Sequence, residues 1–138
     1  MNDELVYRIE TGISSEEFIR LLVASTLGER RPIQDTSRIK RMLQNANLIV
    51  TARMDGKLVG IARSITDHAY CTYLSDLAVD EKYQGMGIGK ELIRQTMLAA
   101  PQTKVILISA PKAVGYYPKI GMSRHENCYF LDDVNQLK

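Results

Sequence analysis

Hydrophobic and polar positions in the first part of the chain follow two different periods. Alternation over residues 5–10 predicts a short strand. A capping-box pattern of serine and glutamate at residues 14–17 precedes apolar residues at helical spacing. We expect a helix there that stops at Gly28 in the left-handed conformation, and a second amphipathic helix capped by Asp35 or Thr36.

The middle of the chain has the shorter period of extended strands. Residues 48–53 and 57–66 are apolar and β-branched, and they flank Asp55 and Gly56, a dipeptide that supplies positive φ in a tight hairpin. A further run of this kind covers residues 70–79. We expect these three strands to pair in antiparallel fashion.

The period then lengthens to that of a helix. Apolar residues over 88–97 define one helical face, and Pro101 ends it. The continuous apolar run at 104–109 predicts a buried strand, so strand, helix and strand follow one another as in a parallel crossover. A short helix is expected around 112–117 and a last strand-like piece at 128–131. The fold class is therefore α/β, with a mixed central sheet that is antiparallel in its front half and contains one parallel βαβ crossover.

Composition agrees with an ordinary globular protein. The chain has 138 residues, of which 45% are hydrophobic and 25% charged, so we expect one domain over residues 1–138. The formal net charge of +2 is too small to indicate binding to nucleic acid or an anionic membrane through charge alone. No stretch is apolar enough to cross a bilayer, and the first residues lack a signal-peptide pattern. We therefore expect a cytoplasmic protein without nucleic-acid or membrane partners.

Few side chains in the sequence suit a metal ion. Cys71 and Cys128 form no CxxC pair, and His68 and His125 are the two histidines. We expect no metal and a reducing compartment.

The segment with the clearest chemical signal is a strand end followed by three alternate glycines, Gly85, Gly87 and Gly89. Glycine allows unusual φ values and lets a ligand approach backbone N–H groups closely, and those donors at a helix start favour a phosphate or diphosphate. The alternative is that the glycines simply form a tight strand-to-helix turn. The spacing does not fit G-x-G-x-x-G, because the three glycines are two residues apart throughout. It does not fit the P-loop pattern G-x-x-x-x-G-K-[ST] either, because Gln84 stands at the first glycine position and Glu91 at the serine or threonine position.

Residues 84–89 do match the pattern Q/R-x-x-G-x-G/A, and residues 113–122 look like A-x-x-F-Y-x-K-x-G-F. Two such motifs in this order resemble the GCN5-related N-acetyltransferase (GNAT) family. The resemblance implies a sheet of about six to seven strands flanked by about four helices, with two strands splayed apart for acetyl-CoA. Acetyl-CoA would be the acetyl donor and coenzyme A the product.

The family's site residues can be placed on this sequence by position. Tyr117 falls on the tyrosine that protonates the departing thiolate in many members. An amine acceptor must also lose a proton, for which Asp76 or an ordered water is the candidate. The family's cofactor contacts fall on Leu77, Ala78, Val79, Gln84, Gly85, Met86, Gly87, Ile88, Gly89, Lys90 and Tyr117.

Two departures from the family pattern affect these assignments. Ala110 stands where many relatives have an asparagine that touches the cofactor or caps the helix, and Pro118 follows Tyr117. The implied function is transfer of an acetyl group to a primary amine of a small molecule, peptide or protein, by direct attack through a tetrahedral intermediate. The alternative is a non-catalytic module that binds coenzyme A or acetyl-CoA. Residues 128–131 are apolar enough to pair, so a homodimer is expected.

Overall fold

A mixed sheet of five strands organises the larger of the two compact units into which the chain divides. The computed structural model describes residues 4–138; the units are Met1–Ile108 and Ser109–Lys138. The elements of the first unit are β1 (Leu5–Ile9), α1 (Ser15–Ala24), the 3-10 turn η1 (Leu27–Arg30), α2 (Thr36–Asn45), β2 (Leu48–Met54), β3 (Lys57–Thr66), β4 (Cys71–Val79), the 3-10 turn η2 (Glu81–Tyr83), α3 (Ile88–Ala99) and β5 (Lys104–Ile106).

The strands lie in the order β1-β2-β3-β4-β5, with the first four antiparallel and β5 parallel to β4. The predicted hairpin between β2 and β3 is confirmed, with φ +50° at Asp55 and +85° at Gly56. The predicted parallel crossover through α3 is confirmed as well. The described residues thus form the expected mixed α/β sheet, with five strands instead of six to seven.

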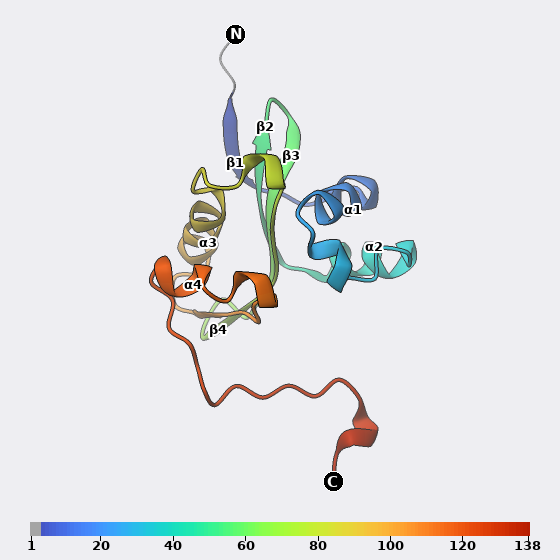
Figure 1. Ribbon diagram of the computed structural model, residues 1–138, viewed down its shortest axis with the longest axis vertical. Helices are drawn as coiled ribbons and strands as arrows, with labels where there is room; N and C mark the ends of the chain where they lie inside the picture. The colour runs from blue at the N-terminus through green and yellow to red at the C-terminus, as the bar shows by residue number, and fades with distance from the viewer. Residues whose placement is uncertain (1–3) are drawn as a thin grey trace. The chain divides into compact units, whose positions relative to one another are not determined.

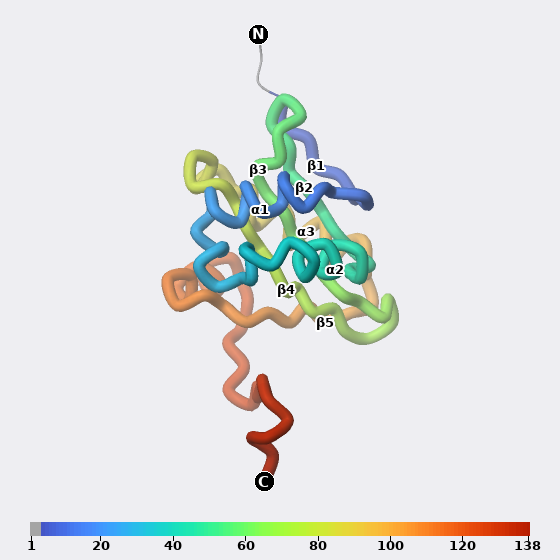
Figure 2. The backbone as a smooth tube through the Cα atoms, turned by 90° about the vertical axis from the view of Figure 1, so that its right-hand side faces the viewer, coloured from blue at the N-terminus to red at the C-terminus, as the bar shows by residue number. Residues whose placement is uncertain are grey.

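Helices cover both faces of this sheet. α1 and α2 lie on one face and α3 on the other (Figure 1), and Figure 2 looks onto the α1–α2 face. The core beneath α1 and α2 contains Phe18, Leu22 and Ile39 together with Ile61 and Ala78 of the strands. The apolar faces predicted for α1 and α2 are the ones that pack on the sheet, whereas Met97, in the face predicted over 88–97, is 47% exposed.

α3 approaches the sheet closely because β3 carries a glycine beneath it. A Cβ atom at Gly60 would lie 3.0 Å from Ile88 Cγ2, 3.1 Å from Leu92 Cδ1 and 3.3 Å from Ala52 Cβ. These distances leave no room for a side chain without displacement of its neighbours. Gly60 therefore sets how deeply the start of α3 sits against the strands.

The caps of the first two helices agree with the sequence, but one helix end does not. Ser14 Oγ accepts a hydrogen bond from the Glu17 amide, and the Asp35 carboxylate caps α2. The residue in the left-handed conformation after α1 is Thr26, at φ +71°, and not Gly28. Gly28 is instead packed against the helix, where a Cβ would meet the Leu22 backbone at 3.2 Å.

The second unit contains the 3-10 turn η3 (Pro111–Ala113), α4 (Tyr116–Lys119) and the 3-10 turn η4 (Val134–Gln136). The predicted helix around 112–117 is therefore divided between η3 and α4. The predicted strand at 128–131 does not form, since no segment of this unit pairs with it, and Tyr129 is 88% exposed. The strand predicted over 104–109 is shorter and ends at Ile106, and it is not buried as predicted, because Ile106 is 43% exposed.

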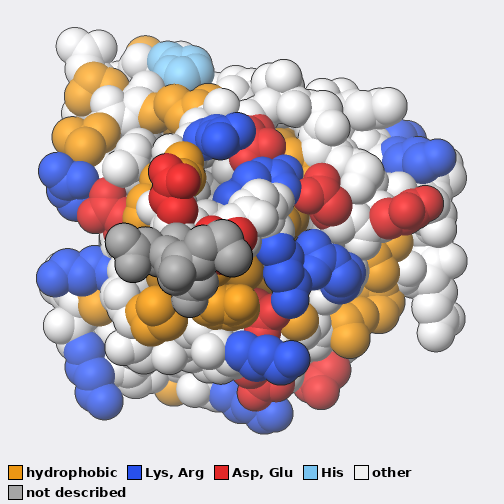
Figure 3. All heavy atoms as spheres, turned by 90° about the horizontal axis from the view of Figure 1, so that it is seen from above, with side chains coloured by type: hydrophobic (Ala, Val, Ile, Leu, Met, Phe, Trp, Pro, Cys, Tyr) orange, Lys and Arg blue, Asp and Glu red, His pale blue; other side chains and the backbone are white. Residues whose placement is uncertain are grey.

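On the face shown in Figure 3, basic and acidic side chains are interspersed. Among the residues that the structure describes, no helix has the length and hydrophobicity needed to cross a membrane.

Candidate functional site

The glycine-rich segment forms an open turn between the end of β4 and the start of α3. Gly85 and Gly87 both have positive φ, +82° and +79°. Gly87 is the N-cap residue of α3, and no side chain within residues 4–138 caps this helix start. A Cβ at either glycine would meet no heavy atom within 4 Å. The described residues therefore do not crowd these two glycines, and the positive end of the helix dipole at this N-terminus favours an anion.

The strand that leads into this turn has one unpaired edge. β4 pairs with β5 through Cys71–Tyr73 and has no partner on that side over residues 74–79 of the described sheet. The Asp80 amide donates to the Val59 carbonyl of β3 at 2.9 Å. Because N–H and C=O groups of an antiparallel strand alternate between its two sides, those of Leu77 and Val79 point away from β3. We call residues 74–79 on this side the open edge of β4.

The predicted cofactor contacts differ in which of their groups are available. Gln84 lies beside the strand end, where its Nε2 donates to the Val79 carbonyl at 3.0 Å. Ala78 is buried in the core beneath α1 and α2, and Ile88 is buried beside Gly60 of β3, so they offer at most backbone groups.

The remaining members of this set lie around the turn. Met86 is exposed, and Gly89 and Lys90 belong to the first turn of α3. The fold thus gathers all the predicted contacts of the first unit around the end of β4, and their role in binding stays a prediction.

Asp76, the predicted base, is fully buried on the α1–α2 face of β4. Its Oδ1 accepts a hydrogen bond from Arg31 Nε at 2.5 Å, and its Oδ2 accepts one from Arg63 Nε. Both carboxylate oxygens are therefore engaged with guanidinium groups, and neither side chain oxygen faces solvent. A general base must reach the substrate's proton directly or through one water, so this geometry favours a different role for Asp76.

Sequence reasoning missed Arg31 and Arg63 as partners of this carboxylate. Arg31 lies in the segment between η1 and α2, and its guanidinium joins this segment to β4. The available signal is the placement of two charged residues, Arg63 and Asp76, within the predicted central strands. Buried charges are rarely found unpaired, so each implies an opposite charge nearby.

Tyr117 belongs to α4 of the second unit. Its ring meets the ring of Tyr116 edge to face, with centroids 5.3 Å apart and planes at 79°. Burial, and to a smaller extent Tyr116, raises the pKa of the Tyr117 phenol above its ordinary value. The phenol is consequently protonated at neutral pH, as a general acid must be.

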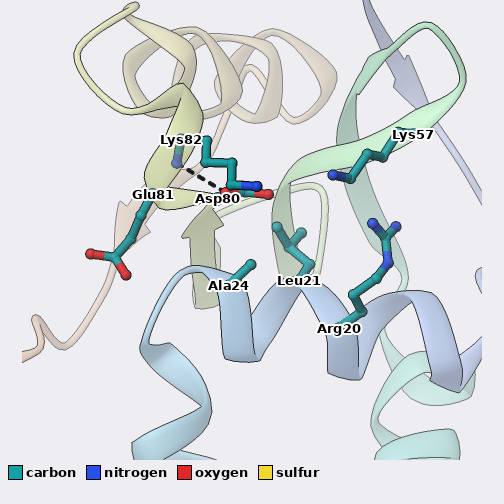
Figure 4. A pocket seen from close by; sticks show the side chains of 7 residues that line it. All are labelled: Arg20, Leu21, Ala24, Lys57, Asp80, Glu81 and Lys82. Atoms are coloured by element: carbon teal, nitrogen blue, oxygen red, sulfur yellow. Dashed lines mark hydrogen bonds between the residues drawn. The ribbon is translucent and has the colours of Figure 1, made fainter.

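A surface hollow of about 370 Å³ lies between α1, the start of β3 and η2 (Figure 4). Arg20 and Lys57 extend into the same space from opposite walls, and the Lys82 amide donates to Asp80 Oδ1 at 3.0 Å. The other residues that line the hollow are Leu21, Ala24 and Glu81.

Over residues 4–138, no group of three or more His, Cys, Asp or Glu side chains is arranged to hold a metal ion.

Comparison with known proteins adds independent findings. Residues 25–134 match the family model described as an acetyltransferase (GNAT) domain. The uncharacterized N-acetyltransferase ycf52 of Pyropia yezoensis is 28% identical over 99 residues, which cover 67% of this chain and 55% of that protein. The chain spans about half the length, or less, of the first curated relatives it matches.

Solved structures share the fold over nearly the whole chain. A GNAT-family acetyltransferase from Streptococcus pneumoniae TIGR4 has a TM-score of 0.78 at 21% identity, covering 97% of this chain and 100% of that one. The aminoglycoside N-acetyltransferase AAC(6')-Iy, solved in complex with CoA, has a TM-score of 0.74 at 16% identity, covering 97% of each chain.

Proposed function

Because the chain belongs to the GNAT acetyltransferase family, we propose that it moves the acetyl group of acetyl-CoA to a primary amine of a small molecule, peptide or protein. The acyl donor supplies a reactive thioester carbonyl and a thiolate leaving group. The chain's own residues must then hold the donor, orient the carbonyl and manage two protons.

The observation that carries this proposal is the open glycine turn in front of an uncapped helix start. Gly85 and Gly87 have positive φ, and no described heavy atom lies within 4 Å of a Cβ added at either one; a diphosphate needs closely approachable N–H donors. The open edge of β4 adjoins the turn and offers the N–H and C=O groups of Leu77 and the N–H group of Val79, whose carbonyl already accepts a hydrogen bond from Gln84 Nε2. An extended arm with amide groups can pair with them as an added strand would. The CoA complex of the structurally similar aminoglycoside N-acetyltransferase supports this choice of donor.

Within this proposal the chain's residues take three tasks. Residues 84–90 hold the diphosphate through backbone N–H groups, and a backbone N–H near Val79 stabilises the oxyanion. Tyr117 donates its phenolic proton to the departing sulfur, for which its protonated state at neutral pH is required. An ordered water accepts the proton of the amine. We also infer that the protein works in the cytoplasm, as a homodimer and without a metal.

The test has two stages. Coenzyme A is first titrated into the full chain while its melting temperature is followed, because a ligand at a hundredfold excess over its Kd raises stability by about 2.7 kcal/mol. Release of free thiol from acetyl-CoA is then followed over a panel of primary amines. A chain that neither binds coenzyme A nor releases thiol with any amine refutes the proposal, and binding without turnover favours a non-catalytic module.

The catalytic assignment is tested with Tyr117→Phe, and Tyr116→Phe is the matched control on the same short helix. We expect Tyr117→Phe to lower the rate of thiol release by roughly a hundredfold, the scale of general acid catalysis, with the Kd of coenzyme A unchanged. Equal rates for the two variants would contradict a proton-donor role for Tyr117.

A further inference from the structure

The sheet contains an irregularity at the point where β4 separates from β5. Across β3 and β4, Arg63 pairs with Asp76 and Ser64 with Leu74, so Ser75 is an extra residue without a partner. A β-bulge of this kind bends the strand and leaves backbone groups outside the ladder. β4 pairs with β5 up to Tyr73 and no further. The bulge therefore stands at the first residues of the open edge.

Two arginines bind the bulge from the α1–α2 face. Arg31 donates from Nε to Asp76 and from its second terminal nitrogen to the Ser75 carbonyl at 2.8 Å. Arg63 donates from Nε to Asp76 and from a terminal nitrogen to Ser75 Oγ at 3.0 Å. We call Arg31, Arg63 and Asp76 the arginine clamp. The hydrogen bonds of the arginine clamp engage the carbonyl and hydroxyl oxygens of Ser75 and both carboxylate oxygens of Asp76.

The clamp also connects the bulge to two other parts of the first unit. Arg31 follows η1 in the segment between α1 and α2, and Arg63 donates to the Met42 carbonyl of α2 at 3.1 Å. The Asp76 side chain is fully buried and that of Arg63 is 7% exposed. Charge-assisted hydrogen bonds in such a setting are stronger and more restrictive than exposed ones.

We propose that the arginine clamp holds the bulge of β4 and thereby keeps the open edge of β4 in the conformation that receives the acyl donor. Asp76 is then a positioning residue that acts through Ser75 and the strand beyond it, and it accepts no proton from the substrate. The identity of the ligand in this inference rests on the proposed function. The effect of the arginine clamp on the conformation of β4 does not depend on it.

The experiment compares Arg31→Met with Arg53→Met. Arg53 is a matched control because it too joins separate elements, donating to Glu10 at 2.8 Å and Glu17 at 2.7 Å, with a side chain 13% exposed against 20% for Arg31. Its partners lie after β1 and in α1, away from the open edge. Each variant is examined by thermal unfolding, by amide hydrogen exchange without ligand, and by titration with coenzyme A.

We expect Arg31→Met to speed exchange selectively over residues 74–79 and to weaken coenzyme A binding by about tenfold, as the loss of one net hydrogen bond would. Arg53→Met should lower the melting temperature while leaving both quantities unchanged. Equal exchange over 74–79 in wild type and Arg31→Met overturns the clamp, whether or not coenzyme A binds. A wild type that does not bind coenzyme A refutes the proposed function alone.

A milder substitution covers the case in which Arg31→Met does not fold. Arg31→Lys keeps a positive charge for Asp76 but lacks the planar fork that serves Asp76 and the Ser75 carbonyl together. Amide exchange over residues 74–79 and the affinity for coenzyme A are again measured. Because lysine keeps only part of the hydrogen bonding of Arg31, we expect a smaller loss of affinity, about threefold. Unchanged exchange and unchanged affinity in a folded Arg31→Lys variant overturn the clamp equally.

Discussion

Adding one methyl group at Gly87 is the sharpest test of the glycine turn. At φ +79° an alanine is strained, and the left-handed conformation costs an L-residue roughly 1–2 kcal/mol. No protein atom lies within 4 Å of the added Cβ, so no clash adds to this cost. Alanine also reduces the freedom of the unfolded chain, which offsets part of the strain. We expect Gly87→Ala to lose about 1 kcal/mol of stability.

The chain contains a control for this strain. Gly56, at the tip of the β2–β3 hairpin, has φ +85°, and a Cβ added there would likewise meet no atom within 4 Å. Gly56→Ala should therefore lose a similar amount of stability. Only Gly87→Ala alters the N–H groups in front of α3, either through its methyl group or through a shift of the turn that relieves strain.

The two variants should separate in their affinity for coenzyme A. Loss of one charge-assisted hydrogen bond costs about 1.5–3 kcal/mol, which corresponds to roughly a ten- to hundredfold rise in Kd. Isothermal titration of coenzyme A into both folded variants measures this difference. If Gly87→Ala binds as tightly as Gly56→Ala and wild type, the diphosphate is not held by this turn.

Three further predictions concern the framework that carries the site. Gly60→Ala should destabilise the protein by about 1–3 kcal/mol, because its Cβ would press on Ile88 and Leu92 and push α3 from the sheet; urea unfolding measures the loss. Ser64→Ala should raise stability by about 1 kcal/mol and the melting temperature by about 4 °C, since the buried Ser64 hydroxyl has no hydrogen-bond partner among the described residues. Calorimetry that shows a lower melting temperature would contradict this. Three backbone N–H groups lower the pKa of Asp67 from 3.8 to about 2, so the stabilisation by this carboxylate is present above pH 4 and is lost as the pH falls towards 2. In acid unfolding, the difference in stability between wild type and Asp67→Ala should therefore shrink between pH 4 and pH 2.

Local signals in the sequence were sufficient wherever neighbours along the chain decide the structure. The caps at Ser14 and Asp35 and the turn at Asp55 and Gly56 each depend on residues a few positions apart. Helical and strand periods then identified the order of elements, because each element must bury one face. The prediction that α1 ends at a left-handed Gly28 was wrong. Thr26, a residue type without a preference for that conformation, is the left-handed residue, and Gly28 instead permits close packing against the helix.

The sequence by itself thus determined the α/β class, the strand and helix order and the glycine turn, all of which follow from short-range patterns. Tertiary structure alone decided that Asp76 would be held between Arg31 and Arg63, because these residues are 45 and 13 positions away and meet only when β3, β4 and the α1–α2 connection pack together. It also decided where β4 leaves β5, since the bulge at Ser75 is a property of strand pairing and not of any one segment.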